Sequence, residues 1–207
     1  MLPTDLAVLA GFWLVHLAAV ASPGPSFVVV SRAAVQGSTG TGVAVAAGLA
    51  LGTFVWAAAA WFGLSVLFAL VPALYVAAKI AGAAFLLFLA VQLWRHAREP
   101  LALVAPERVP GRGQAFRTGV WTQLANPKVA VFFGSVFAAV LPPAPSAPVV
   151  VAVFAIVCLN EFLWYSLVAL LLSRPAVRRR YVAAKAWIDR VTGTVLAALG
   201  LRLLAPG

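Results

Sequence analysis

The stretch "ASPGPSFVVV" at residues 21–30 places two prolines and a glycine inside a long apolar run. Proline lacks the N–H group that a helix needs and clashes with the preceding turn, whereas glycine loosens the backbone. As one helix, the run at residues 6–36 would be about 46 Å long, against about 30 Å for the hydrocarbon core of a bilayer. The sequence therefore predicts a membrane helix that is broken near its middle, at Pro23.

Composition independently indicates a polytopic membrane protein. Of the 207 residues, 64% are hydrophobic and 10% are charged, against roughly half and a quarter in a soluble domain. A soluble chain of this length has too little interior to bury so much apolar surface. The net charge of +10 comes mainly from Lys and Arg near loops, so we expect no nucleic-acid partner. The single cysteine, Cys158, excludes intramolecular disulfides and a two-thiol relay.

We expect an all-α fold with six transmembrane helices. The apolar runs cover residues 6–36, 43–70, 73–94, 114–141, 148–172 and 186–204. The first, third and fifth linkers carry or adjoin basic residues, whereas the second and fourth carry none. The positive-inside rule then places the basic linkers in the cytoplasm and both termini outside a bacterial inner (plasma) membrane. We read residues 173–185 as a solvated loop, with contact between its Arg178–Arg180 run and anionic lipid as the alternative.

The two halves of the chain resemble each other. Residues 21–31 align with 125–135, residues 43–56 with 151–164, and residues 79–93 with 190–204. Each half holds three predicted spans, so the second half enters the membrane upside down, as in the inverted repeats of secondary transporters. We therefore divide the single transmembrane domain (1–207) into a first repeat at 1–95, a basic cytoplasmic linker at 96–113 and a second, inverted repeat at 114–207.

The repeat superposes Pro23 on Pro127, so it predicts two broken first helices and a site near the membrane midplane. Backbone groups freed at such breaks are tolerated where they are buried in protein or line a wet cavity. Half-helix ends there can hold charged groups. The alternative is that these prolines only kink two packed helices. The residues predicted to bind substrate are Pro23, Gly24, Pro25, Asn126, Pro127, Lys128, Asn160 and Glu161.

Charged residues inside the spans also point to a site. Glu161 lies near the centre of the fifth span, where an ionisable residue costs about 2.5–3.5 kcal/mol on insertion scales. We expect it to pair with Lys128 and to carry a coupling proton; the alternative is a purely structural ion pair. Lys79 is a second coupling candidate unless it snorkels to the surface.

Two other features of the spans favour packing over chemistry. His16, a lone histidine on an apolar helix, is expected to be a hydrogen-bonded packing residue. Gly48 and Gly52 have the small-xxx-small spacing that lets helices approach closely. The same glycine face permits a homodimer.

Four motifs resemble the lysine exporter (LysE/RhtB) family of bacterial amino-acid exporters. They are "SPGPSFVVVSR" at 22–32, "GLALGTFVWAAAAWFGLS" at 48–65, "KIAGAAFLLFLAVQLWR" at 79–95 and "QLANPKVAVFFGSVF" at 123–137. The resemblance implies an inner-membrane exporter of amino acids or close derivatives, driven by the proton motive force, with the amino acid, protons and membrane lipid as partners. By position, residues 23–25 match the first family motif and residues 126–128 match the second.

One residue departs from the family pattern. The family often carries an aspartate after the glycine at position 52, where this chain has Thr53. The repeat places Glu161 opposite Thr53, so the acidic function is expected to have moved to the other half. Thr53 therefore joins Glu161 and Lys79 as a coupling candidate.

Other functions fit the sequence less well. A metal-ion exporter needs clusters of His, Cys or carboxylates, which the spans lack, and export of another small solute stays open. A membrane-embedded enzyme or thiol-electron carrier is disfavoured by the single cysteine and by Glu161 as the single intramembrane acid. A non-transport assembly protein would leave the deep charges and paired breaks unexplained. We therefore predict no catalytic residue, no metal site and no cofactor.

Overall fold

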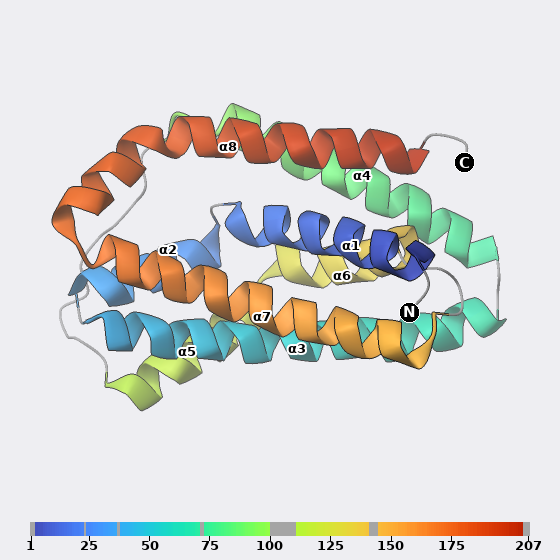
Figure 1. Ribbon diagram of the computed structural model, residues 1–207, viewed down its shortest axis with the longest axis horizontal. Coiled ribbons are helices and arrows are strands. Elements are labelled where there is room, and N and C mark those ends of the chain that lie inside the picture. Colours follow the sequence, from blue (N-terminus) through green and yellow to red (C-terminus); the bar gives the residue numbers. More distant parts are fainter. Residues whose placement is uncertain are drawn as a thin grey trace.

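The computed structural model describes residues 3–22, 24–36, 38–70, 73–99, 111–140 and 145–204. The regular structure in these residues is entirely helical, which confirms the all-α prediction. The helices are α1 (Pro3–Ala21), α2 (Pro25–Gln36), α3 (Thr39–Leu70), α4 (Ala73–Arg95), α5 (Arg112–Leu124), α6 (Pro127–Val140), α7 (Ala147–Leu172) and α8 (Pro175–Leu204). Most of them run along the long axis of the molecule (Figure 1).

The first helix of each half is broken where the sequence predicts. α1 ends at Ala21 and α2 begins at Pro25, with a bend of 60° between them. α5 ends at Leu124 and α6 begins at Pro127. Both prolines occupy the first position of a helix, where the missing N–H would have had no helical partner. The order of a broken helix followed by two long helices therefore occurs in both halves, first in α1–α4 and again in α5–α8.

Among the described helices, two are long and apolar enough to cross a membrane alone. They are Thr39–Gly63 of α3 and Ala147–Leu172. The bent pair of α1 and α2 makes a third if the two helices together form one span. The described apolar part of α4 is shorter, Ile80–Arg95, and α8 carries Lys185, Asp189 and Arg190 in its middle turns. The chain is thus a membrane protein with several apolar helices, and six spans stay a prediction.

Basic residues gather at one end of the helix bundle. The carboxyl ends of α2, α4 and α7 and the amino ends of α3, α5 and α8 gather at one end of the molecule, and the two termini lie at the other (Figure 1). Basic residues are concentrated near the first end, including Arg95, Arg98, Arg112 and Arg174. This arrangement is the one that the positive-inside rule requires of a single cytoplasmic face.

One predicted loop is a helix instead. We expected residues 173–185 to form a solvated linker, but α8 begins at Pro175 and continues without interruption to Leu204. Proline suits the first helical position, and the Ala, Arg and Lys residues that follow are strong helix formers. The basic charge of this segment therefore did not identify a loop.

Glycines allow α3 and α5 to approach closely. A Cβ atom added at Gly48 would collide with the carbonyl oxygen of Phe116, and one at Gly119 with that of Val45. A Cβ atom at Gly52 would lie 2.7 Å from the Cβ of Gln123. The predicted small-residue face therefore packs within the chain, as expected of Gly48 and Gly52. It is covered by α5, which corrects the suggestion that it serves a homodimer.

We predict that Gly48→Ala lowers the free energy of unfolding by about 1–3 kcal/mol, because the added methyl group overpacks two helix backbones. The matched control is Gly11→Ala, since a Cβ atom there meets nothing within 4 Å. Thermal unfolding in detergent measures both. Equal stability of the Gly48 variant and the wild type would show that α3 and α5 do not pack this closely.

Candidate functional site

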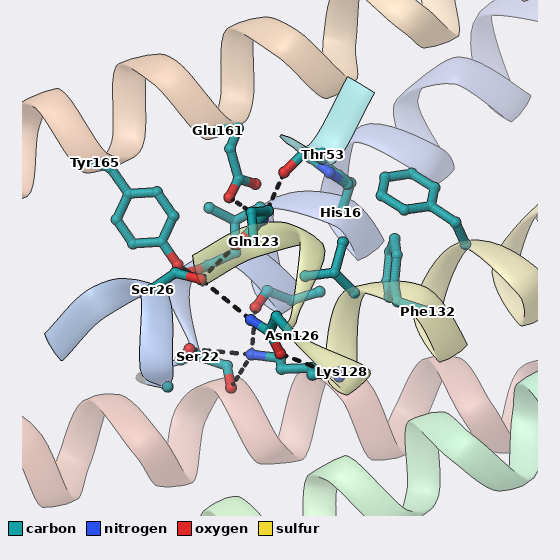
Figure 2. Close-up of a pocket in the computed structure, with 15 residues that line it drawn as sticks. His16, Ser22, Ser26, Thr53, Gln123, Asn126, Lys128, Phe132, Glu161 and Tyr165 are labelled. Carbon is teal, nitrogen blue, oxygen red and sulfur yellow. Dashed lines mark hydrogen bonds between the residues drawn. The ribbon is translucent and has the colours of Figure 1, made fainter. Parts of the chain in front are cut away.

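A small pocket lies between the two helix breaks (Figure 2). Its volume is ≈ 30 Å³, enough for about two water molecules. Both halves of the chain contribute to its wall. The polar residues that line it are His16, Ser22, Ser26, Thr53, Gln123, Asn126, Lys128, Glu161 and Tyr165.

Lys128 connects the second break to the first. Its Nζ atom donates to the carbonyl oxygen of Ala19 at 2.8 Å and to the carbonyl and hydroxyl oxygens of Ser22 at 3.1 and 2.8 Å. These carbonyls belong to the end of α1, where the helix offers no N–H partners and its dipole is negative. An ammonium group has three N–H donors, and this arrangement occupies all of them. The lysine thus caps the carboxyl end of α1 from the start of α6.

Trp56 makes the reciprocal contact. Its indole Nε1, on α3, donates to the carbonyl oxygens of Gln123 and Leu124 at 3.2 and 3.3 Å. These are the last carbonyls of α5, just before the second break. Asn126 then starts α6, since its Oδ1 atom accepts a hydrogen bond from the backbone N–H of Lys128 at 3.1 Å. Each break is therefore satisfied in part by a side chain from the other half.

Gln123 is the centre of a buried polar network (Figure 2). Its Nε2 atom donates to Thr53 Oγ1 at 2.5 Å and to Glu161 Oε1 at 2.7 Å. Its Oε1 atom accepts from the Ser26 hydroxyl at 2.6 Å, and that hydroxyl accepts from Asn126 Nδ2 at 3.1 Å. Both amide hydrogens and the amide oxygen of Gln123 are used. The network joins α2, α3, α5 and α7 at one point.

Aromatic rings and two further polar residues complete the wall. The His16 ring lies 5.7 Å from each of the Phe132 and Phe133 rings, and its Nδ1 atom is 3.3 Å from Asn160 Nδ2. This is the hydrogen-bonded packing position predicted for His16. On the other side, the Tyr165 hydroxyl donates to the carbonyl oxygen of Val20 at 3.2 Å. The pocket thus has a polar, charged side and an aromatic side.

Several known proteins are similar in sequence to this chain, some of them over nearly its whole length. The family model for the LysE type translocator matches residues 17–207. The threonine efflux protein of Escherichia coli (strain K12) is 31% identical over 194 residues, covering 92% of this chain and 94% of that protein. The threonine efflux protein of Salmonella typhi has the same identity and coverage. The homoserine/homoserine lactone efflux protein of Salmonella typhimurium is 30% identical over 122 residues, 59% of each chain. No solved structure matches the chain significantly.

The chain belongs to the LysE type translocator family. It is a membrane transporter and not an enzyme. The resemblance drawn from its Pro-Gly-Pro and Asn-Pro-Lys motifs is thereby confirmed. Within the described residues, no group of three or more His, Cys, Asp or Glu side chains could hold a metal ion.

The predicted site residues of this LysE-type transporter fall into three groups according to whether they line the pocket. Those that line the pocket are Gly24, Asn126, Lys128 and Glu161, together with the coupling candidate Thr53. Those that do not line it are Pro25 and Pro127, which are exposed and begin helices, and Asn160, which contacts His16 and the Trp13 carbonyl. Pro23 and the side chain of Lys79 lie outside the described residues.

One expectation about charge is wrong. Glu161 and Lys128 form no ion pair among the described side chains, because Gln123 binds the carboxylate and α1 binds the ammonium. A second acid is buried among the described helices. Asp189 of α8 is also buried, at 2% exposed, and its Oδ2 atom accepts from Lys185 Nζ at 2.7 Å.

Sequence reasoning missed the neutral residues that join the network, namely Ser22, Ser26, Gln123 and Tyr165. A search for charges and helix breakers passes over them, since each is a common residue in or beside an apolar helix. Three of them could have been found from their positions, which lie close to the helix-breaking motifs. Ser22 and Ser26 flank the Pro-Gly-Pro motif, and Gln123 stands three residues before Asn126. Neutral polar residues next to a predicted helix break are therefore site candidates in the same way as charged ones.

We predict that Lys128→Met lowers the free energy of unfolding by about 2–3 kcal/mol, because the α1 carbonyls lose a charged hydrogen-bond donor. Thermal unfolding in detergent measures the effect. Arg117→Met, at an exposed position of α5, removes the same charge without touching a break, so it should change stability by less than about 0.5 kcal/mol. Similar losses in both variants would contradict the capping role of Lys128.

Proposed function

We propose that this chain is a secondary transporter that exports amino acids or close derivatives from the bacterial cytoplasm, driven by protons. Family membership supports this, as do the relatives named for threonine efflux and for homoserine or homoserine lactone efflux. Small hydroxylated amino acids are accordingly the first substrates to test. The observation that carries the proposal is one buried pocket, between two helix breaks, that contains both Lys128 and Glu161.

The chemistry of the pocket suits a zwitterion. Lys128 provides positive charge for a carboxylate, and the amino end of α2, beside Gly24, provides further N–H groups. Glu161 provides negative charge for an ammonium group. Between them, the Gln123 amide and the hydroxyls of Ser26 and Thr53 are available to a polar substrate side chain. These side chains are hydrogen-bonded to one another in the structure. When substrate binds, its polar groups would replace some of these hydrogen bonds.

The size of the pocket implies movement. Its ≈ 30 Å³ admits water but not an amino acid, so the two breaks must separate to admit substrate. The contacts that would open join the two halves, from Lys128 to α1 and from Gln123 to Thr53. Rocking of one repeat against the other around a central site is the general mode of alternating access in inverted-repeat transporters.

The proposed mechanism assigns coupling to Glu161. It is the carboxylate of the pocket and shares the Gln123 amide with Thr53, the position at which the family often carries an acid. A proton and the substrate ammonium would compete for the same carboxylate. That competition exchanges an inward proton for an outward amino acid.

We predict that Glu161→Gln removes the pH-dependent part of transport, lowering proton-driven uptake by at least about tenfold in inverted membrane vesicles. Glutamine cannot release a proton, yet it keeps an oxygen that can accept from Gln123, so the protein should fold. Uptake of radiolabelled threonine at several pH values is the measurement. The control is Glu99→Gln, an exposed carboxylate at the end of the bundle. Wild-type pH dependence in the Glu161 variant would rule out Glu161 as the coupling group.

The proposed topology has six spans in two inverted repeats, with both termini outside the inner membrane. Cys158 is the single cysteine, so Cys158→Ser gives a background for labelling. In that background, a membrane-impermeant maleimide added to intact cells should label Ser146→Cys and not Arg98→Cys. Both residues are exposed; Ser146 directly precedes α7 and Arg98 follows α4, and these two helix ends lie at opposite ends of the molecule (Figure 1). Labelling of Arg98→Cys alone would invert the topology.

A further inference from the structure

A second hollow lies on the outside of the bundle, along α8 and the end of α4. It is lined by Trp94, Trp187, Arg190, Val191, Thr194 and Val195, and its volume is ≈ 430 Å³. α4 and α8 run side by side there (Figure 1). We call this hollow the α4–α8 groove.

At the floor of the groove, α4 and α8 approach each other closely. A Cβ atom at Gly193 would lie 2.7 Å from Trp94 Cδ1 and 3.0 Å from the carbonyl oxygen of Ala90. Trp94 therefore rests on α8 at a position without a side chain. The indoles remain open to the surroundings, since Trp94 is 53% and Trp187 71% exposed.

The position of the groove corresponds to one membrane interface. Trp94 is the next-to-last residue of α4 and precedes Arg95. The groove thus begins at the basic end of the molecule and continues along the apolar residues Val191 and Val195. Tryptophan is enriched at this level of a membrane. On the proposed topology, this level is the cytoplasmic leaflet, whose lipids carry negative charge.

Arg190 gives the groove a specific chemistry. Its guanidinium carbon lies 5.8 Å from the centroid of the Trp94 ring. Its Nε atom is buried and has no hydrogen-bond partner among the described residues. The neighbouring acid, Asp189, is buried and binds Lys185 at 2.7 Å, so the structure records no ion pair between it and Arg190. Arg190 also lines the groove, and a guanidinium fixed against an aromatic ring is suited to a phosphate group.

We propose that the α4–α8 groove binds an anionic phospholipid, with the phosphate at Arg190 and an acyl chain along Val191 and Val195. Membrane anchoring by Trp94 and Trp187 alone accounts for the indoles but not for a guanidinium that lines the groove and lies against the Trp94 ring. The inference uses the proposed orientation only to name the leaflet, and it is independent of the central pocket and its substrate.

The test measures lipid binding to the purified full-length protein by native mass spectrometry, with phosphatidylglycerol and phosphatidylcholine of the same acyl chains. We expect the wild type to bind phosphatidylglycerol more tightly than phosphatidylcholine. In Arg190→Gln the ratio of the two affinities should fall about fivefold, which is the contribution of one basic residue near an anionic membrane surface. Arg202→Gln, which removes an exposed charge from the last turn of α8, should keep the preference.

Two more measurements distinguish a bound phospholipid from a bound phosphate ion and from general attraction of anionic lipid to a basic protein. Trp187→Ala changes an exposed side chain, so it should fold, and it should weaken the binding of phosphatidylglycerol. Inorganic phosphate alone should not raise the thermal stability of the wild type, because the acyl chain contributes to binding. An unchanged lipid preference in Arg190→Gln, or equal losses in Arg190→Gln and Arg202→Gln, would overturn the proposal.

Discussion

The structure depends on how two interrupted helices satisfy the backbone groups at their breaks. The last carbonyl groups of α1 and α5 lack the N–H groups of a further helical turn, although that of Gln123 accepts from the backbone N–H of Asn126, and lipid would offer them no donor. Lys128 of the second half donates to the end of α1, and Trp56 of the first half donates to the end of α5. Neither break is satisfied by its own half alone. The two halves are therefore bound to each other at the points where their helical backbones are interrupted.

This reciprocal arrangement explains why the pocket is polar and small. Lys128 and the network around Gln123 line the same pocket, between the two breaks and against α3 and α7. A transporter needs such contacts to be exchangeable rather than permanent, since a substrate must replace them. On the proposed function, hydrogen bonds from an ammonium and an amide meet that need, because the carboxylate of an amino acid can accept from both donors and its ammonium group can donate to the acceptors that they leave. On the proposed mechanism, the hydrogen bonds that hold the two halves together are the same ones that the substrate replaces.

The sequence predicted the parts of the fold that depend on local chemistry. Proline and glycine located both breaks, and the small-residue pattern at Gly48 and Gly52 identified a close helix contact. The partners of charged groups could not be predicted in the same way, because they depend on which helices face each other. Lys128 and Glu161 are complementary in charge, but the carbonyls at the end of α1 and the amide of Gln123 are their nearest partners. Asp189 lies in the predicted span 186–204, but Lys185, four residues before it, belongs to the predicted loop, so their contact along one helix was not predicted.

The most direct test of this account is an experimental structure of the full-length protein in lipid nanodiscs with threonine added. We predict density for the amino acid between the two helix breaks, with its carboxylate on the Lys128 side and its ammonium near Glu161. We also predict that the hydrogen bonds from Lys128 to α1, or from Gln123 to Thr53, are replaced by bonds to the substrate. Threonine bound away from the breaks, with the network around Gln123 intact, would contradict the central claim.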